Sequence, residues 1–150
     1  MSMKDGVNAK NLQKLATFLA YGDLPAEVAF NMNHFSSHDG YGEELTAGNC
    51  GAAGCAIGFA PFAGIKKKWG ESFFAFSERT LLNPFIHRKS WLWCFDPDWS
   101  SCDNTPLGAA KRIQLLLDLG DVPDGFSAMS SSFVQFVPLY KSVVVKGEAA

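Results

Sequence analysis

The sequence lacks the long apolar run that a membrane-spanning helix requires. Such a helix needs about 20 consecutive, mostly apolar residues, and no unbroken apolar run among the 150 residues reaches eighteen. The first twenty residues contain Lys4, Asp5, Lys10 and Lys14, so they also lack the uncharged core of a secretory signal peptide. We therefore expect a cytoplasmic protein with no membrane partner.

An excess of basic side chains is also missing. Thirteen Lys and Arg residues stand against fifteen Asp and Glu residues, which gives a formal net charge of −2. Proteins that grip duplex nucleic acid are usually basic, because binding depends on neutralising phosphates. The composition therefore disfavours duplex nucleic acid as a partner. A hydrophobic share of 47% excludes wholesale disorder.

The familiar catalytic and nucleotide-binding signatures are absent too. The chain contains no Walker loop, no Gly-x-Gly-x-x-Gly after a strand, no Gly-x-Ser-x-Gly and no His-Glu-x-x-His. These absences favour a non-enzymatic protein and leave open an enzyme with a less regular site. In the cytoplasm, the four cysteines are expected to be thiols, metal ligands or a nucleophile rather than disulfides.

What the chain does contain is typical of one mixed α+β domain. Its length corresponds to a single domain, and its thirteen Phe residues are expected to fill the core. Apolar periodicity and capping residues predict helices over 9–21, 50–60, 71–82 and 106–119. In the first of these helices, Lys10, Lys14 and Thr17 fall on the face opposite the apolar stripe.

Alternating, aromatic or β-branched residues predict a small sheet as well. Its strands are expected at 28–33, 91–95, 133–137 and 142–146. Residues 1–126 would form the globular domain. The strand-rich tail over 127–150 would then pack on that domain or mediate assembly into a homo-oligomer.

A first candidate site is a metal centre. Two imidazoles and two thiols fall within 22 residues, at His34, His38, Cys50 and Cys55. Zinc accepts this ligand set in tetrahedral sites, although the spacing matches no common zinc finger. The alternative is a pair of surface histidines and two buried thiols that pack as small apolar groups. We expect no cofactor, with zinc as the alternative.

A second candidate is a cysteine nucleophile. Cys50 begins the predicted helix 50–60, where free N–H groups and the helix dipole would lower the pKa of its thiol. His87, His34 or His38 would act as the base. The stretch loosely resembles the cysteine-bearing helix of papain-like and transglutaminase-like enzymes. That resemblance implies a hydrolase or transferase.

A third candidate is an aromatic binding face. Trp91, Trp93 and Trp99 lie within nine residues, shortly after Arg88. Tryptophan beside a cation can stack on a base or contact a partner. The alternative is that these rings pack in the core.

Two motifs carry a family resemblance. The first is Cys-Gly-x3-Cys-x-x-Gly at 50–58, and the second is Asp-Asn-Thr-Pro-x-Gly-Ala-Ala-x-Arg-Ile at 103–113. Together they resemble small uncharacterised proteins of bacteriophages, prophages and their bacterial hosts, over about residues 10–125. The resemblance implies no activity, but it suggests a phage accessory protein, a class that includes anti-defence factors.

The sequence therefore predicts a non-enzymatic binding protein of phage type that holds a host protein or a small-molecule ligand. A cysteine-dependent hydrolase or transferase using Cys50 is the first alternative, and a zinc-stabilised interaction module is the second.

Overall fold

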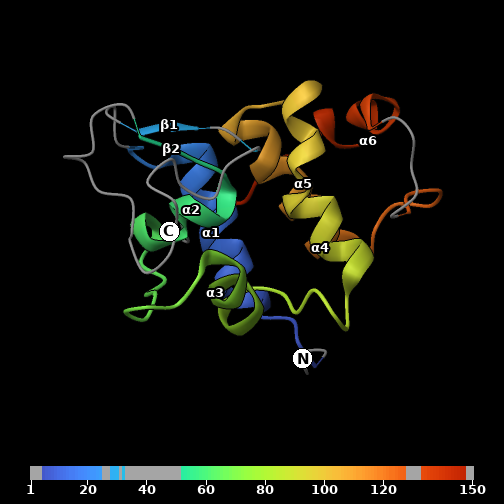
Figure 1. Cartoon of the computed structure of the whole chain (residues 1–150). Helices are drawn as coiled ribbons and strands as arrows, with labels where there is room; N and C mark the ends of the chain where they lie inside the picture. Colours follow the sequence, from blue (N-terminus) through green and yellow to red (C-terminus); the bar gives the residue numbers. More distant parts are fainter. Residues whose placement is uncertain (1–4, 25–27, 31, 33–51, 128–132, 148–150) are drawn as a thin grey trace.

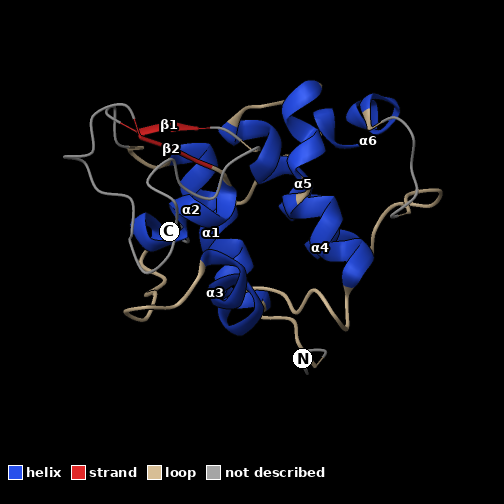
Figure 2. Cartoon of the chain, in the orientation of Figure 1, coloured by secondary structure: helices blue, strands red, loops and turns tan. Residues whose placement is uncertain are grey.

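The computed structural model describes residues 5–24, 28–30, 32, 52–127 and 133–147 (Figure 1). Over these residues the protein is mainly helical (Figure 2). The helices are α1 (Ala9–Tyr21), α2 (Ala56–Phe59), α3 (Phe73–Thr80), α4 (Arg88–Phe95), α5 (Pro106–Leu119) and α6 (Val137–Lys141). Short 3-10 helices lie at η1 (Ala60–Ala63), η2 (Pro97–Ser101) and η3 (Val134–Phe136). Two three-residue strands, β1 (Val28–Phe30) and β2 (Ala52–Gly54), pair in parallel.

The start of helix α1 is fixed by a side-chain cap. Asn8 is the N-cap, and its side-chain oxygen accepts a 3.0 Å hydrogen bond from the backbone N–H of Asn11. The predicted helix 9–21 is confirmed. Its buried side recurs every three or four positions, which places one apolar stripe against the core. That stripe consists of Leu12, Leu15, Ala16 and Leu19.

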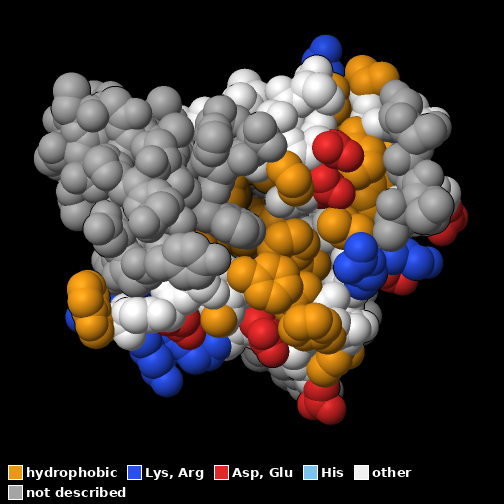
Figure 3. All heavy atoms as spheres, viewed as in Figure 1, with side chains coloured by type: hydrophobic (Ala, Val, Ile, Leu, Met, Phe, Trp, Pro, Cys, Tyr) orange, Lys and Arg blue, Asp and Glu red, His pale blue; other side chains and the backbone are white. Residues whose placement is uncertain are grey.

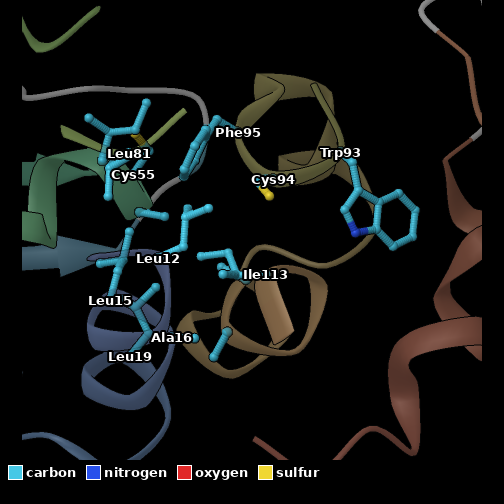
Figure 4. Close-up of a cluster of buried hydrophobic side chains, with 14 of the residues drawn as sticks. Leu12, Leu15, Ala16, Leu19, Cys55, Leu81, Trp93, Cys94, Phe95 and Ile113 are labelled. Atoms are coloured by element: carbon cyan, nitrogen blue, oxygen red, sulfur yellow. The ribbon is translucent and has the colours of Figure 1, made fainter. Parts of the chain in front are cut away.

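Helix α5 packs against this stripe along its length, and the pair forms the most extensive helix contact in the fold. Thr105 caps α5 by accepting a 3.0 Å hydrogen bond from the N–H of Gly108. The helix ends at Gly120, whose φ of 78° closes the last turn in the left-handed region. The predicted helix 106–119 is confirmed. Small side chains at Ala109 and Ala110 let the two helices approach closely, and Ile113 faces the α1 stripe (Figure 4).

The predicted α+β fold is wrong, because the expected sheet is not formed. Residues 91–95 lie in α4, and residues 133–137 lie in η3 and the start of α6. Residues 142–146 form no strand. Helix α4 is buried on more than one side, so its apolar pattern resembles that of a buried strand. Periodicity alone does not separate those two cases.

Two of the other elements differ from the prediction in extent. The predicted helix 50–60 forms only in its second half, as α2, which η1 extends. Residues 52–54 are instead β2, in register with β1, so Val28 pairs with Ala52. The glycines in this stretch disfavour a helix, because they lose the most backbone freedom on folding. Of the predicted strand 28–33, β1 accounts for 28–30.

Helix α3 is shorter than the predicted 71–82. It begins after Ser72, whose hydroxyl accepts a 3.1 Å hydrogen bond from the N–H of Ala75. Among the residues that the structure describes, no helix has both the length and the apolar character needed to cross a bilayer.

The C-terminal part, residues 133–147, folds back onto the rest of the described chain. Its buried side chains are Phe133, Phe136, Tyr140 and Val145. The three aromatic rings among them contact the core aromatics Trp93, Trp99 and Phe126, mostly edge to face. The expectation of paired strands here is therefore wrong, since η3 and α6 supply helical turns that complete an aromatic core.

Candidate functional site

A cavity of about 790 Å³ opens beside α1, within the usual size range of ligand pockets. One face of α1 forms its floor, through Lys10, Gln13, Lys14, Thr17, Phe18 and Tyr21. Gly22 and Asp23 follow at the end of that helix. The remaining walls come from distant parts of the sequence, namely Phe62 and Ala63 of η1 and the C-terminal pair Lys146 and Gly147. We refer to this cavity as the α1 pocket.

Side chains of α1 and α5 hold the C-terminal wall in place. Tyr21 Oη donates a 2.7 Å hydrogen bond to the carbonyl of Val145, and Thr17 Oγ1 donates one of 2.7 Å to the carbonyl of Lys146. The N–H of Lys146 donates to Gln114 Oε1 at 3.1 Å. This extended segment therefore meets its backbone hydrogen-bonding needs through side chains rather than through a sheet.

The charge of the α1 pocket is mainly positive. Lys10, Lys14 and Lys146 line it, against one carboxylate, that of Asp23. None of these three ammonium groups forms an ion pair with a residue that the structure describes. Three cations around one cavity raise the local concentration of anions. The pocket is therefore suited to a negatively charged ligand.

Aromatic rings form the other part of the wall. Phe18 and Phe62 are half-buried, and Tyr21 is 60% exposed. The Phe62 ring is held by Phe59, with ring centroids 5.9 Å apart. Tyr21 is held by its hydroxyl, through the bond to the carbonyl of Val145. These rings give the pocket flat apolar surfaces, and the contacts to Phe59 and Val145 hold two of them in place before a ligand arrives.

The tryptophans of the predicted aromatic face lie in the core. Trp91 is 8% exposed, whereas Trp93 and Trp99 are fully buried. All three indole N–H groups donate to acceptors within the protein. Arg88 is exposed at the start of α4. The three rings therefore present no open face on which a base could stack.

The candidate metal ligands are only partly within the described structure. His34, His38 and Cys50 lie outside the described residues. Cys55 is buried, and burial raises the pKa of its thiol to about 11. Across the described ranges, no three His, Cys, Asp or Glu side chains gather as a metal site would require. The zinc centre stays a prediction.

The candidate cysteine–histidine pair also lies only partly within the described residues. Cys50 lies outside the described residues, so its distance from His87 is not defined. His87 Nε2 lies 2.6 Å from the carbonyl oxygen of Asp5, a contact that ties the turn before α4 to the N-terminal segment. The cysteine-dependent enzyme therefore also stays a prediction.

The second motif, at 103–113, surrounds a buried arginine. Arg112 is completely buried, and its guanidinium carbon lies 4.4 Å from the Trp99 ring centre and 5.2 Å from that of Tyr140. Its Nη1 donates a 2.9 Å hydrogen bond to Tyr140 Oη and lies 3.6 Å from Asp103 Oδ2. Burial lowers the pKa of Arg112. The nearby carboxylate and the two ring faces offset part of the cost of burying this charge, while Arg112 Nε and Nη2 form no hydrogen bond with a described residue.

The other motif residues support the same cluster. Thr105 Oγ1 donates to Asp103 Oδ1 at 2.7 Å, and Asn104 Oδ1 accepts a 2.7 Å bond from the N–H of Met32. A side chain at Gly108 would overlap the carboxylate of Asp103. The motif is therefore explained by folding requirements, namely a helix start, an ion pair between buried Arg112 and partly exposed Asp103, and the close approach of Gly108 to Asp103.

A separate apolar area lies on the face shown in Figure 3, beside α4. The exposed large apolar side chains of the described residues include Phe74, Phe85 and Ile86. Asn83 Oδ1 fixes the turn that carries two of them, by accepting from the N–H groups of Phe85 at 2.8 Å and Ile86 at 3.0 Å. These side chains are therefore presented on a rigid turn.

Sequence reasoning did not identify the α1 pocket. It placed Lys10, Lys14 and Thr17 on the outer face of a helix, where lysines are ordinary solvated residues. The pocket exists because Phe62 and Lys146 are brought to that face by the tertiary fold. No local pattern in the sequence predicts that Phe62 and Lys146 lie beside this face of the helix.

Compared with known protein families, curated proteins and solved structures, the chain shows no match.

Proposed function

We propose that this protein is a non-enzymatic binding protein that holds a small anionic ligand in the α1 pocket. The observation that carries the proposal is the set of three lysines, Lys10, Lys14 and Lys146, around one cavity with no ion-pair partner among the described residues. The remaining lining groups are amides, hydroxyls and aromatic rings, which bind and orient a ligand.

The proposal selects one of the two kinds of partner expected from the sequence. A small ligand is favoured over a host protein because the lysines line a concave site of ligand size. A ligand-holding role fits the accessory class that the phage resemblance suggests. The phage setting itself stays a prediction.

The direct test is a calorimetric titration of the full chain with inorganic pyrophosphate, a compact polyanion. We expect saturable binding that weakens as salt is added, because exposed charges are screened. Lys14→Glu should weaken binding about tenfold, since one attractive charge becomes repulsive. The matched control is Lys89→Glu, which reverses an exposed lysine on α4 outside the pocket and should leave the affinity unchanged.

Two results would count against the proposal. One is the absence of any binding by pyrophosphate and by the nucleotide probes used below. The other is an equal loss in the Lys14→Glu and Lys89→Glu variants, which would indicate attraction by net charge rather than by a defined pocket.

A further inference from the structure

The α1 pocket is electrically polarised along its length. Lys10 and Lys14 lie in the N-terminal half of α1, and Asp23 follows the C-terminal end of the helix. The helix dipole has the same direction, positive at the start and negative at the end. Side-chain charges and backbone dipoles therefore agree. One end of the pocket favours an anionic group, and the other favours a group that donates hydrogen bonds.

Two of the three aromatic rings lie at the second of these ends. Phe18 and Tyr21 lie in the last turns of α1, next to Asp23, and Phe62 lines the same cavity from η1. Aromatic side chains stack on any planar heterocycle of the nucleobase type, because each such heterocycle has a π-face. The Asp23 carboxylate can accept hydrogen bonds from an amino group on the edge of that heterocycle.

The spacing along α1 sets the length of the ligand. The midpoint of Lys10 and Lys14 lies seven to eight residues before the midpoint of Phe18 and Tyr21. This separation corresponds to about 11 Å at the helical rise. The backbone of Lys146 lies between the two groups, because its carbonyl accepts the bond from Thr17. Lys10 and Lys14, with Lys146 on the opposite wall, therefore form a basic region next to the rings, which fits a chain of negative charges ending in a planar base.

We propose that the α1 pocket takes a nucleoside triphosphate or diphosphate. The base stacks at the end formed by Phe18, Tyr21 and Phe62, and the phosphates extend from there toward Lys14 and Lys10, with Lys146 beside them. This inference rests on the proposed function and specifies the chemical class of its ligand. Both parts of the ligand are required, since the lysines recognise only the phosphates and the rings recognise only the base.

The test compares three probes on the full chain by calorimetry: ATP, inorganic tripolyphosphate and adenosine. Tripolyphosphate matches the phosphate chain without the base, and adenosine matches the base without the phosphates. We expect ATP to bind about tenfold or more tightly than tripolyphosphate, because stacking adds to charge attraction. Adenosine should bind more weakly than ATP by a similar or larger factor.

Two variants separate the contributions of the two ends. Phe62→Leu removes a ring but keeps apolar bulk, so it should weaken ATP binding and leave tripolyphosphate binding unchanged. Lys14→Glu should weaken both phosphate probes and leave adenosine binding unchanged. The control for the ring is Phe85→Leu, which replaces an exposed phenylalanine outside the pocket. Because the three probes are compared first on the unaltered chain, the result does not depend on the stability of a variant.

The outcomes separate the two proposals. If tripolyphosphate binds as tightly as ATP, the nucleotide inference is overturned, whereas an anion-binding pocket remains supported. If Phe62→Leu weakens the binding of ATP and of tripolyphosphate equally, the base does not stack at this end of the pocket, and the inference is again overturned. If none of the probes binds and pyrophosphate also fails, both proposals fall together.

Discussion

Tyr140 Oη donates a 2.6 Å hydrogen bond to Asp103 Oδ2 and accepts one of 2.9 Å from Arg112 Nη1. A single phenol hydroxyl thus connects α6 to Asp103, which lies three residues before the start of α5, and to a buried cation. Thirty-seven residues separate Tyr140 from Asp103 in the sequence, so this contact fastens the C-terminal part of the fold. The stability of that part is therefore expected to depend on a few polar atoms inside an aromatic core.

Removing this hydroxyl should destabilise the protein measurably. Tyr140→Phe keeps the ring and deprives Arg112 of its hydrogen-bond acceptor, while Asp103 loses a donor. Leaving a buried charged group short of partners costs about 1–3 kcal/mol, and we expect a loss in that range by urea unfolding. Tyr21→Phe is the matched control, since its hydroxyl bonds to a backbone carbonyl at a more exposed position. Equal losses in the two variants would contradict the special role of Tyr140.

Gly108→Ala should be destabilising, contrary to the usual rule for helices. Within a helix, alanine is normally favoured over glycine by about 0.5–1 kcal/mol. Here the added carbon would overlap the Asp103 carboxylate, so we expect a net loss of about 1–3 kcal/mol from overpacking. A double-mutant cycle provides the control. In an Asp103→Ala background the cost of Gly108→Ala should largely disappear, and a cost of the same size in both backgrounds would refute the explanation.

An exposed ion pair should make stability depend on acid pH. Arg79 Nε and Nη2 each lie 2.8 Å from an oxygen of Glu71. The hydrogen bond from Arg79 lowers the pKa of Glu71 from its ordinary value of 4.5 to about 2. Because the pKa is depressed in the folded state, the pair stabilises the protein above the ordinary value. That stability is lost as the pH falls from 4.5 toward 2.

Glu71→Gln should therefore flatten the acid limb of the stability curve. The free energy of unfolding, measured in urea at several pH values between 5 and 2, should fall less steeply in this variant than in the unaltered protein. Glu78→Gln, on α3, is the control and should keep the original slope, since Glu78 forms no ion pair with a described residue. Identical slopes for all three proteins would show that Glu71 does not contribute.

Two of the cysteines should resist alkylation in the native state. Burial raises the pKa of Cys55 to about 11 and that of Cys94 to about 12, and the thiolate is the reactive form. Iodoacetamide at neutral pH should therefore modify both residues much more slowly in the folded protein than in urea. Mass spectrometry of the peptides gives the rate at each site. Rapid native labelling of Cys55 would contradict its buried placement.

The same experiment tests the enzymatic alternative. If Cys50 reacts faster than a free thiol at neutral pH, the cysteine-dependent mechanism gains support and the proposal of a non-enzymatic binding protein is weakened. If Cys50 reacts no faster than a cysteine in the denatured chain, its thiol is not activated and the mechanism loses its nucleophile.

The sequence predicted elements whose ends are determined locally. Helices 9–21 and 106–119 were placed correctly because Asn8, Thr105 and Gly120 provide start and stop signals within one turn. The predicted strand 91–95 was wrong because helix α4 is buried on several sides, which no single period reveals. The C-terminal strands were wrong for a related reason. Their β-forming residues are required by an aromatic core formed by distant parts of the chain, and such packing overrides propensity.

The α1 pocket was beyond sequence reasoning for a different reason. Its parts lie more than a hundred residues apart, at Lys10 and Lys146, and each looks ordinary in its own neighbourhood. By contrast, the tryptophans are conspicuous in the sequence and are used for packing. In this protein the rare tryptophans therefore lie in the core, whereas common residues such as lysine line the candidate site.

The position of Lys146 and Gly147 has a practical consequence. Because these residues form a wall of the α1 pocket, Gly147 lies at that pocket and is three residues from Ala150. An affinity tag attached there would place its own charges and flexible residues beside the opening, where a histidine-rich or acidic tag would compete with a ligand or screen it. Ligand occupancy, conversely, should protect this end from carboxypeptidase digestion, which makes trimming of the chain a simple readout of binding.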